Sequence, residues 1–283
     1  MLTKEEQQRL RNLSPVFIWA PLGRCGTTLL QRLLLSSREI LIYGEDEYFI
    51  NILPGVILDI SGRRDELDAV RKKVIDDGDV GCWEVTALAA NPTDYNRFLV
   101  EEFYRLVRCY DASTRGDGWG RWGIKKPLRK FSSYLILSEL LPRAQHIFVY
   151  RHLAAVMRSY KARKWIKSPV DFLRECHLFR QNMTSILDLP TSESILRICY
   201  EDLVGEPERE SERLCDFLGV DAVDLDVFGQ KVNTFAGKAQ EGHSPTQYIE
   251  PEGLTEEEAE CLAKVGREVL ERAGYERGEE KPR

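Results

Sequence analysis

Residues 16–28, Val-Phe-Ile-Trp-Ala-Pro-Leu-Gly-Arg-Cys-Gly-Thr-Thr, decide the fold, because an apolar run stops at a glycine-bracketed turn and an amphipathic helical pattern follows at once. A strand that enters such a turn at a helix N-terminus directs several backbone N–H groups and the positive end of the helix dipole at one point. That point suits a bound phosphate or sulfate, and Arg24, Thr27 and Thr28 would add side-chain donors. Similar turns also occur without any ligand, and this purely structural reading stays open here.

The turn differs from that of nucleoside triphosphatases, which reads G-x-x-x-x-G-K-[ST] and uses its lysine to reach the β- and γ-phosphates. Gly26 aligns with the second glycine, Pro21 stands where the first would be, and Thr27 occupies the lysine position. The sequence therefore predicts a pocket for a 5′-phosphate group without the triphosphate and magnesium apparatus. A P-loop small-molecule kinase is the alternative, and the missing lysine counts against it.

A second strand runs into a second helix over residues 145–163. Arg151 ends the strand and Ser159 follows eight residues later, about two helical turns on, so both side chains are able to face one side of the junction. A guanidinium and a hydroxyl at that place would hold a second phosphate. The alternative is a helix-capping arginine and a solvated serine. The basic stretch 158–167 belongs either to the same site or to a solvated helix face.

The wider pattern predicts an α/β fold in which a central parallel β-sheet is flanked by helices. No repeat or low-complexity linker divides the chain, so we expect a single domain over 1–283 with flexible ends at 1–13 and 278–283. Strand-like runs lie near 16–21, 40–43, 145–150 and 194–199, amphipathic helices over 94–110, 171–188 and 255–273, and a mobile loop is expected at 111–120.

The 283-residue chain is 43% hydrophobic and carries a formal net charge of −6, which argues against general affinity for nucleic acid. Its seven scattered cysteines, without C-x-x-C spacing, predict neither a disulfide framework nor a zinc site. The N-terminus is too polar for a secretory signal, and no run approaches the roughly 18 apolar residues of a membrane span. We therefore expect a reducing, cytoplasmic location, while no pattern predicts the oligomeric state.

Four segments, in this order along the chain, resemble the sulfotransferase superfamily that uses 3′-phosphoadenosine 5′-phosphosulfate (PAPS). Arg24-Cys-Gly-Thr-Thr-Leu-Leu resembles the 5′-phosphosulfate loop R-S-G-T-T-L-L, and Trp122-Gly-Ile-Lys-Lys-Pro resembles the W-G-x-K-x-P segment of bacterial and protein-tyrosine members. Arg151 with Ser159 matches the family's R-x7-S pair, and Tyr200-Glu-Asp-Leu before Phe217-Leu-Gly matches Y-E-D-L followed by F-L-G. The resemblance implies a P-loop nucleotide-binding-like sulfotransferase fold.

The resemblance also implies the reaction, in which a sulfuryl group passes from PAPS to an acceptor hydroxyl or amine and adenosine 3′,5′-bisphosphate is released. No metal is required, and no motif identifies the small-molecule or glycan acceptor. In this family the segments between the first helix and the 3′-phosphate strand shape the acceptor pocket, so we expect residues 48–60 and 80–92 to determine the choice of acceptor. The implied nucleotide contacts are Arg24, Cys25, Gly26, Thr27, Thr28 and Leu29 at the 5′-phosphosulfate, Arg151 and Ser159 at the 3′-phosphate, Tyr200 near the adenine, and Lys238.

In-line transfer needs fixed positive charge at the sulfuryl group, for which Arg24 and Lys125 are the candidates, and a base at the incoming hydroxyl. We interpret the neighbouring Lys126 as solvating the surface. The chain has no K-T-H-x-P segment, which carries the catalytic histidine of cytosolic members, so we expect a carboxylate base. Gly44-Glu-Asp-Glu-Tyr-Phe is similar to the Gly-Glu-containing stretch that holds the catalytic glutamate of bacterial and protein-tyrosine members, and this resemblance implies Glu47 or Glu45 as the base. A solvated acidic loop is the alternative for these glutamates. A third reading of the whole chain is a nucleotide-binding protein of the same fold without turnover.

Overall fold

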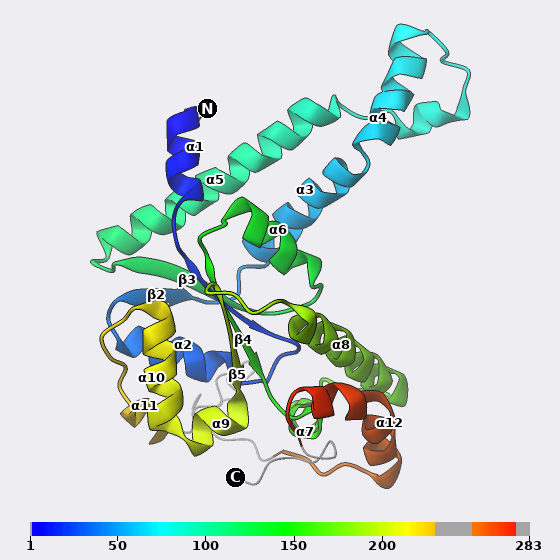
Figure 1. Cartoon of the computed structure of the whole chain (residues 1–283). Helices are drawn as coiled ribbons and strands as arrows, with labels where there is room; N and C mark the ends of the chain where they lie inside the picture. Colours follow the sequence, from blue (N-terminus) through cyan, green and yellow to red (C-terminus); the bar gives the residue numbers. More distant parts are fainter. Residues whose placement is uncertain (1, 230–250, 276–283) are drawn as a thin grey trace, which may run out of the picture. The chain divides into compact units, whose positions relative to one another are not determined.

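The computed structural model describes residues 2–229 and 251–275 and confirms an α/β fold around a five-stranded parallel sheet (Figure 1). The strand order is β2-β3-β1-β4-β5. Four strands coincide with the runs predicted from the sequence, whereas β3 was not predicted as a strand and its residues were noted only for their family resemblance. The bounds are β1 Val16–Ala20, β2 Ile40–Tyr43, β3 Arg121–Pro127, β4 Gln145–Tyr150 and β5 Ile195–Cys199.

Strand β1 lies in the middle of the sheet, between β3 and β4, and all five of its residues are buried. Its central residue Ile18 lies opposite Lys125 of β3 and Ile147 of β4. The fit between β1 and β3 is close at Gly123, where an added Cβ would lie 2.3 Å from the carbonyl oxygen of Val16. A glycine is therefore required at this position, and the polar sequence around it is held in a buried strand.

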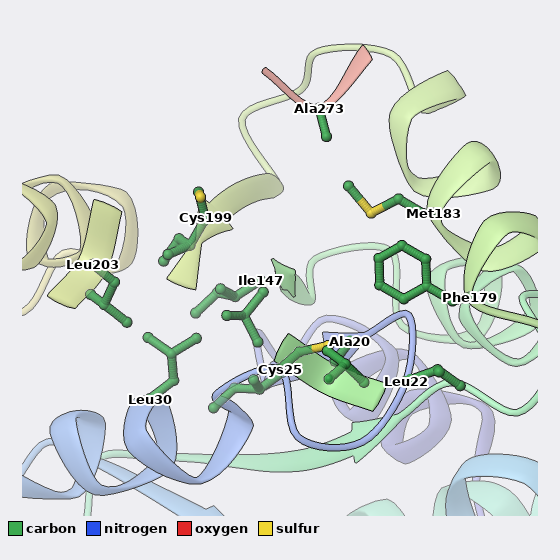
Figure 2. Packing of buried hydrophobic residues seen from close by; sticks show 14 of the residues in the cluster. Ala20, Leu22, Cys25, Leu30, Ile147, Phe179, Met183, Cys199, Leu203 and Ala273 are labelled. Atoms are coloured by element: carbon green, nitrogen blue, oxygen red, sulfur yellow. The ribbon is translucent and has the colours of Figure 1, made fainter. Parts of the chain in front are cut away.

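One face of the sheet forms the main hydrophobic core, because alternate residues of its strands are apolar and fully buried. These side chains pack with residues of α2 (Thr27–Ser36), α7 (Leu153–Ala162), α8 (Pro169–Asp188) and α12 (Glu256–Arg272). Figure 2 shows Leu30 of α2, Ile147 of β4 and Phe179 of α8 in this cluster. Full burial of each such side chain contributes about 1.5–3 kcal/mol relative to leaving it in water.

The opposite face of the sheet carries an aromatic cluster that includes a buried histidine. Phe17 stacks on Trp19 and on His146, and Trp122 meets Phe17 edge-on. Trp19 Nε1 donates a hydrogen bond to His146 Nδ1 at 3.0 Å. Burial lowers the pKa of His146 to about 3, so this imidazole is neutral in the folded protein.

The chain divides into two compact units. Unit 1 comprises Met1–Ser14, Asp46–Asp117 and Ser132–Arg143, and unit 2 comprises Pro15–Glu45, Gly118–Phe131 and Ala144–Arg283, including the whole sheet. The single domain expected over 1–283 stays a prediction. The helices of unit 1 are α1 Lys4–Arg11, α3 Leu53–Gly62, α4 Arg64–Arg71, α5 Pro92–Gly116 and α6 Ser132–Leu140, with short turns at Tyr48–Ile52, Lys72–Asp76 and Trp83–Ala87. The remaining helices of unit 2 are α9 Tyr200–Gly205, α10 Pro207–Leu218 and α11 Asp226–Gly229.

The three helices expected over 94–110, 171–188 and 255–273 are present as α5, α8 and α12. The mobile loop expected at 111–120 is wrong for its first half, because α5 continues to Gly116. Asp111 is buried there and accepts a hydrogen bond from Arg115 Nε at 3.1 Å, one helical turn later. It also lies 3.7 Å from a guanidinium nitrogen of Arg9, so two cations stabilise this buried carboxylate.

Residues 4–11, within the segment expected to be flexible, form α1. Thr3 and Glu6 make reciprocal side-chain to backbone bonds at its start, and Leu10 is fully buried. Across the described ranges, no helix is both long enough and apolar enough to cross a membrane.

Candidate functional site

The candidate residues of unit 2 gather where the parallel strands end. The chain leaves β1 toward β2 on one side of the sheet and leaves β4 toward β5 on the other, so the strand order reverses between β1 and β4 (Figure 1). In open α/β sheets this reversal, at the carboxyl ends of the strands, is where ligands bind. The turn 21–26 follows β1 and Arg151 follows β4, so both lie at this place.

The turn after β1 has the backbone of an anion cradle. Arg24 has φ 67° and Gly26 has φ 104°, so two of its residues are left-handed, and α2 begins at Thr27 without a side-chain cap. The first N–H groups of α2 are therefore not satisfied by a capping side chain. Gly26 is required for a second reason, since an added Cβ would lie 2.4 Å from Cδ2 of the Tyr200 ring.

The side chains of the turn and of the first turn of α2 differ in how deeply they are buried. Thr27 is buried at the start of α2, and Thr28 and Leu29 follow in its first turn, half-buried. Cys25 is fully buried among apolar side chains (Figure 2), and burial raises the pKa of its thiol to about 12. Cys25 is therefore a neutral packing residue, which contributes its backbone and not its sulfur.

Arg24 joins the phosphate turn to the helix after β4. Its Nε donates a hydrogen bond to Ser159 Oγ at 3.0 Å. Burial, and then the charge of Arg151, lower the pKa of Arg24. The three groups that the sequence assigned to two phosphate subsites thus converge. The solvated serine considered for Ser159 is wrong, because its hydroxyl accepts from this buried guanidinium.

Arg151 does not cap the following helix. His152 occupies the N-cap of α7, and its Nδ1 accepts the N–H of Ala154 at 3.2 Å. The guanidinium carbon of Arg151 instead lies 4.5 Å from the centre of the Tyr200 ring, a cation–π contact. Its Nε is buried and has no hydrogen-bond partner within the described ranges. Tyr200 therefore borders both the arginine and the phosphate turn.

Arg163 is a site residue that the sequence reasoning did not single out. Its Nε and Nη2 are buried and have no hydrogen-bond partner among the residues that the structure describes. Burial, and then the charge of Arg24, lower its pKa, which places the two guanidiniums close together. Its spacing, four residues after Ser159 and thus about one helical turn, was the available signal. Its neighbour Lys161 pairs with Glu258 at 2.6 Å, so the basic stretch has more than one role.

Three partly buried guanidiniums, a hydroxyl and a helix N-terminus thus share one corner of unit 2, and in the described chain the buried Nε of Arg151 and the buried Nε and Nη2 of Arg163 have no hydrogen-bond acceptor. Such a set of donors suits an anion with more than one negative group, because each guanidinium is able to form charge-assisted hydrogen bonds to phosphate oxygens.

The end of β3 presents two lysines to one carboxylate. Lys125 Nζ lies 3.3 Å and Lys126 Nζ 3.2 Å from the two oxygens of Glu45, which follows β2. Only 14% of the Lys125 side chain and 11% of the Lys126 side chain is exposed. The interpretation of Lys126 as a solvating surface residue is therefore wrong. These three groups, two ammoniums and one carboxylate, together carry a net charge of about +1.

The other expected base, Glu47, belongs to unit 1. Its Oε1 accepts a hydrogen bond from Asn51 Nδ2 at 2.9 Å at the start of the Tyr48–Ile52 turn. Between the two glutamates, Asp46 accepts the N–H of Phe49 at 2.9 Å and the hydroxyl of Tyr110, so it has a structural role. Lys238 lies outside the described residues.

The chain matches a family model described as "Sulfotransferase family" over residues 15–224, well over half of its length. No curated protein matches it. Solved structures that it resembles include the sulfotransferase domain of the olefin synthase of Synechococcus PCC 7002, at 21% identity, with 77% of each chain covered and a TM-score of 0.47.

Two further structures are similar at lower identity. The sulfotransferase domain from the curacin biosynthetic pathway has 17% identity, covers 76% of this chain and 77% of its own, and has a TM-score of 0.46. A sulfotransferase from Mycobacterium tuberculosis H37Rv has 16% identity, with 80% of this chain and 76% of its own covered, and a TM-score of 0.42.

Proposed function

This chain belongs to the sulfotransferase family, and from that premise we propose that it transfers a sulfuryl group from PAPS to a hydroxyl or amine of a small-molecule or glycan acceptor. The observation that carries the choice of donor is the group of buried guanidiniums, in which Arg151 and Arg163 keep N–H groups without an acceptor in the described chain. Leaving such donors unpaired costs about 1–3 kcal/mol each, and a phosphate that pairs them removes this cost.

The residues fit a donor with two separate phosphate groups. We propose that the first turn of α2, with Arg24 and Thr27, holds the 5′-phosphosulfate, and that Arg151, Ser159 and Arg163 hold the 3′-phosphate. The ring of Tyr200, already in contact with Arg151, would face the adenine. Thr27 stands where a kinase has its phosphate-binding lysine, so the triphosphate alternative gains no support from this site.

Transfer spreads negative charge over the sulfuryl oxygens and the leaving phosphate, so positive charge fixed beforehand lowers the barrier. Arg24 provides it on the side of the phosphate turn, and Lys125 and Lys126 carry an excess of about +1 at the end of β3. The acceptor hydroxyl must lose its proton, and we propose Glu45 or Glu47 as the base. Bound PAPS supplies the sulfuryl group, and this scheme uses no metal.

Calorimetric binding of adenosine 3′,5′-bisphosphate tests the proposal, with AMP and with ATP plus magnesium as comparators. We expect tight, magnesium-independent binding of the bisphosphate, weaker binding of AMP, and a large loss in Arg151→Ala. Preference for magnesium-ATP, or indifference to the 3′-phosphate, would contradict the donor. Binding without transfer to any acceptor in a broad screen would instead favour a nucleotide-binding protein without turnover.

A further inference from the structure

Asn182 of α8 holds together the exits of two neighbouring strands. Its side chain is 1% exposed, and its Nδ2 donates to the carbonyl oxygen of Pro21 at 2.9 Å and to that of Leu128 at 3.2 Å. Pro21 is the first residue after β1, and Leu128 is the first after β3. The N–H of Leu128 still bonds to the carbonyl of Ala20, but Pro21 has no N–H with which to continue the pairing. The amide of Asn182 takes over at that point.

Tyr160 of α7 holds the next part of the same turn. Its hydroxyl accepts the N–H of Gly23 at 3.1 Å, and its ring packs edge-on against Trp165 at 5.0 Å between centroids. A Cβ on Gly23 would lie 3.1 Å from this hydroxyl, so the close approach depends on glycine. The Tyr160 ring is buried, and burial raises the pKa of its hydroxyl, which therefore stays protonated.

These contacts separate the parts of the turn. The segment 21–23 is bonded at both ends to side chains of α7 and α8, and the N–H of Gly23 is already used. The start of α2, which no side chain caps, lies beyond this fixed segment. Through Asn182, the turn is also tied to the residue that follows the Lys125-Lys126-Pro127 strand end. One buried amide therefore bonds both to the residue after β1, where the phosphate turn begins, and to the residue after β3, where the two lysines lie.

We propose that Asn182 and Tyr160 are positioning residues, a brace that shapes the phosphate turn before the nucleotide binds and fixes it relative to the lysines of β3. The inference rests on the proposed function for its kinetic consequence. A primary amide suits this place because two carbonyl oxygens need two N–H donors, which an aspartate lacks entirely and a serine supplies only once. Geometry that is set in advance matters because a displacement of about 1 Å is able to cost about 100-fold in rate.

The variants Asn182→Ala and Tyr160→Phe test the brace, and Met183→Ala is the matched control because Met183 is a fully buried core residue of the same helix, α8. At a temperature where all are folded, we expect Asn182→Ala to lower kcat about 10- to 100-fold at saturating donor. Tyr160→Phe should weaken bisphosphate binding about 5- to 10-fold, as expected for one lost hydrogen bond. Met183→Ala should lose as much thermal stability as the other two variants. Its kcat and its affinity for the bisphosphate should stay within about twofold of the wild-type values.

Hydrogen exchange in the free protein gives a readout that does not depend on the donor. Without Tyr160's hydroxyl, the Gly23 N–H and its neighbours should exchange faster, while Met183→Ala leaves this segment as slow as the rest of the core. Asn182→Ser keeps one donor and should give a kcat between those of the wild type and Asn182→Ala. It tests the brace if Asn182→Ala does not fold. Variants that lose stability but keep wild-type exchange, affinity and kcat would overturn the brace. A wild-type protein that ignores the bisphosphate would refute the proposed function instead, and the exchange result would still stand.

Discussion

Replacing Arg163 by glutamine separates a binding arginine from a structural one. Arg163 buries Nε and Nη2 without a partner in the described chain, and its pKa is lowered by burial and by the charge of Arg24. A structural arginine has its N–H groups paired within the protein, as Arg121 has with the carbonyl oxygen of Leu218. We therefore expect Arg163→Gln to weaken nucleotide binding strongly, and to leave the free protein as stable as the wild type or more stable.

The size of the effect follows from the two unpaired nitrogens. Hydrogen bonds to charged groups contribute about 1.5–3 kcal/mol each, so two of them correspond to about 3–6 kcal/mol. Even the lower value predicts about a 100-fold loss in affinity, since about 1.4 kcal/mol is a factor of ten. In the free protein, removal of the buried unpaired donors offsets the lost packing of the arginine stem. The thermal midpoint should therefore stay the same or rise by a few degrees.

Calorimetry with adenosine 3′,5′-bisphosphate and thermal unfolding without ligand measure the two effects. Lys167→Gln is the matched control, because it removes one positive charge from an exposed residue close by in the same basic stretch. Its affinity should change by less than about threefold, through screened long-range charge alone. Arg163 is not a binding residue if Arg163→Gln binds the bisphosphate like the wild type, or if the main effect of the substitution is a lower thermal midpoint in the free protein.

Three further outcomes are expected. His146 has a pKa of about 3 when the protein is folded and about 6.5 when it is unfolded, so the free energy of unfolding decreases as the pH falls from 6.5 toward 3. Between pH 7 and pH 5, denaturant unfolding should show a decrease that is about 2 kcal/mol smaller in His146→Asn than in the wild type. Gly26→Ala should abolish bisphosphate binding in titrations, because its Cβ would lie 2.4 Å from Cδ2 of Tyr200 and its backbone would be held at a positive φ. Of Glu45→Gln and Glu47→Gln, the variant at the base should lose about 100-fold or more in kcat while its affinity for the bisphosphate is kept. A wild-type kcat in both variants would exclude both glutamates as the base.

The sequence predicted those parts of the fold whose pattern of apolar and polar residues is contiguous along the chain. The apolar run, turn and helix over 16–28 are contiguous, so β1 and α2 were predictable from pattern alone. Strand β3 was not, because Gly123 and two lysines hide a strand whose burial is imposed by β1 and β2 on either side. The end of α5 was missed for a similar reason, since the partner that stabilises Asp111 from outside the helix is Arg9, far away in the sequence.

The candidate site shows the same limit at the level of side chains. Motif spacing identified Arg24, Arg151 and Ser159, but only the folded chain brings Arg163 beside Arg24. From the sequence, one of the two adjacent lysines was expected only to solvate the surface, and the family position favoured Lys125 as the functional one. Both instead reach Glu45, because β3 is ending there and a long lysine side chain is able to bend around the strand end.

The two groups of positive charge in unit 2 differ in how they are compensated, and this difference bears on the choice of base. The guanidiniums of Arg151 and Arg163 have buried N–H groups without an acceptor in the described chain, whereas the lysines of β3 already share a carboxylate. If Glu45 takes the proton of the acceptor, its charge disappears and both ammonium groups become available in the same step in which the sulfuryl oxygens need them. If Glu47 is the base, Glu45 only orients the lysines, and their net charge stays near +1 throughout. The first arrangement couples proton removal to charge stabilisation, and it predicts that loss of the Glu45 carboxylate impairs kcat far more than donor binding.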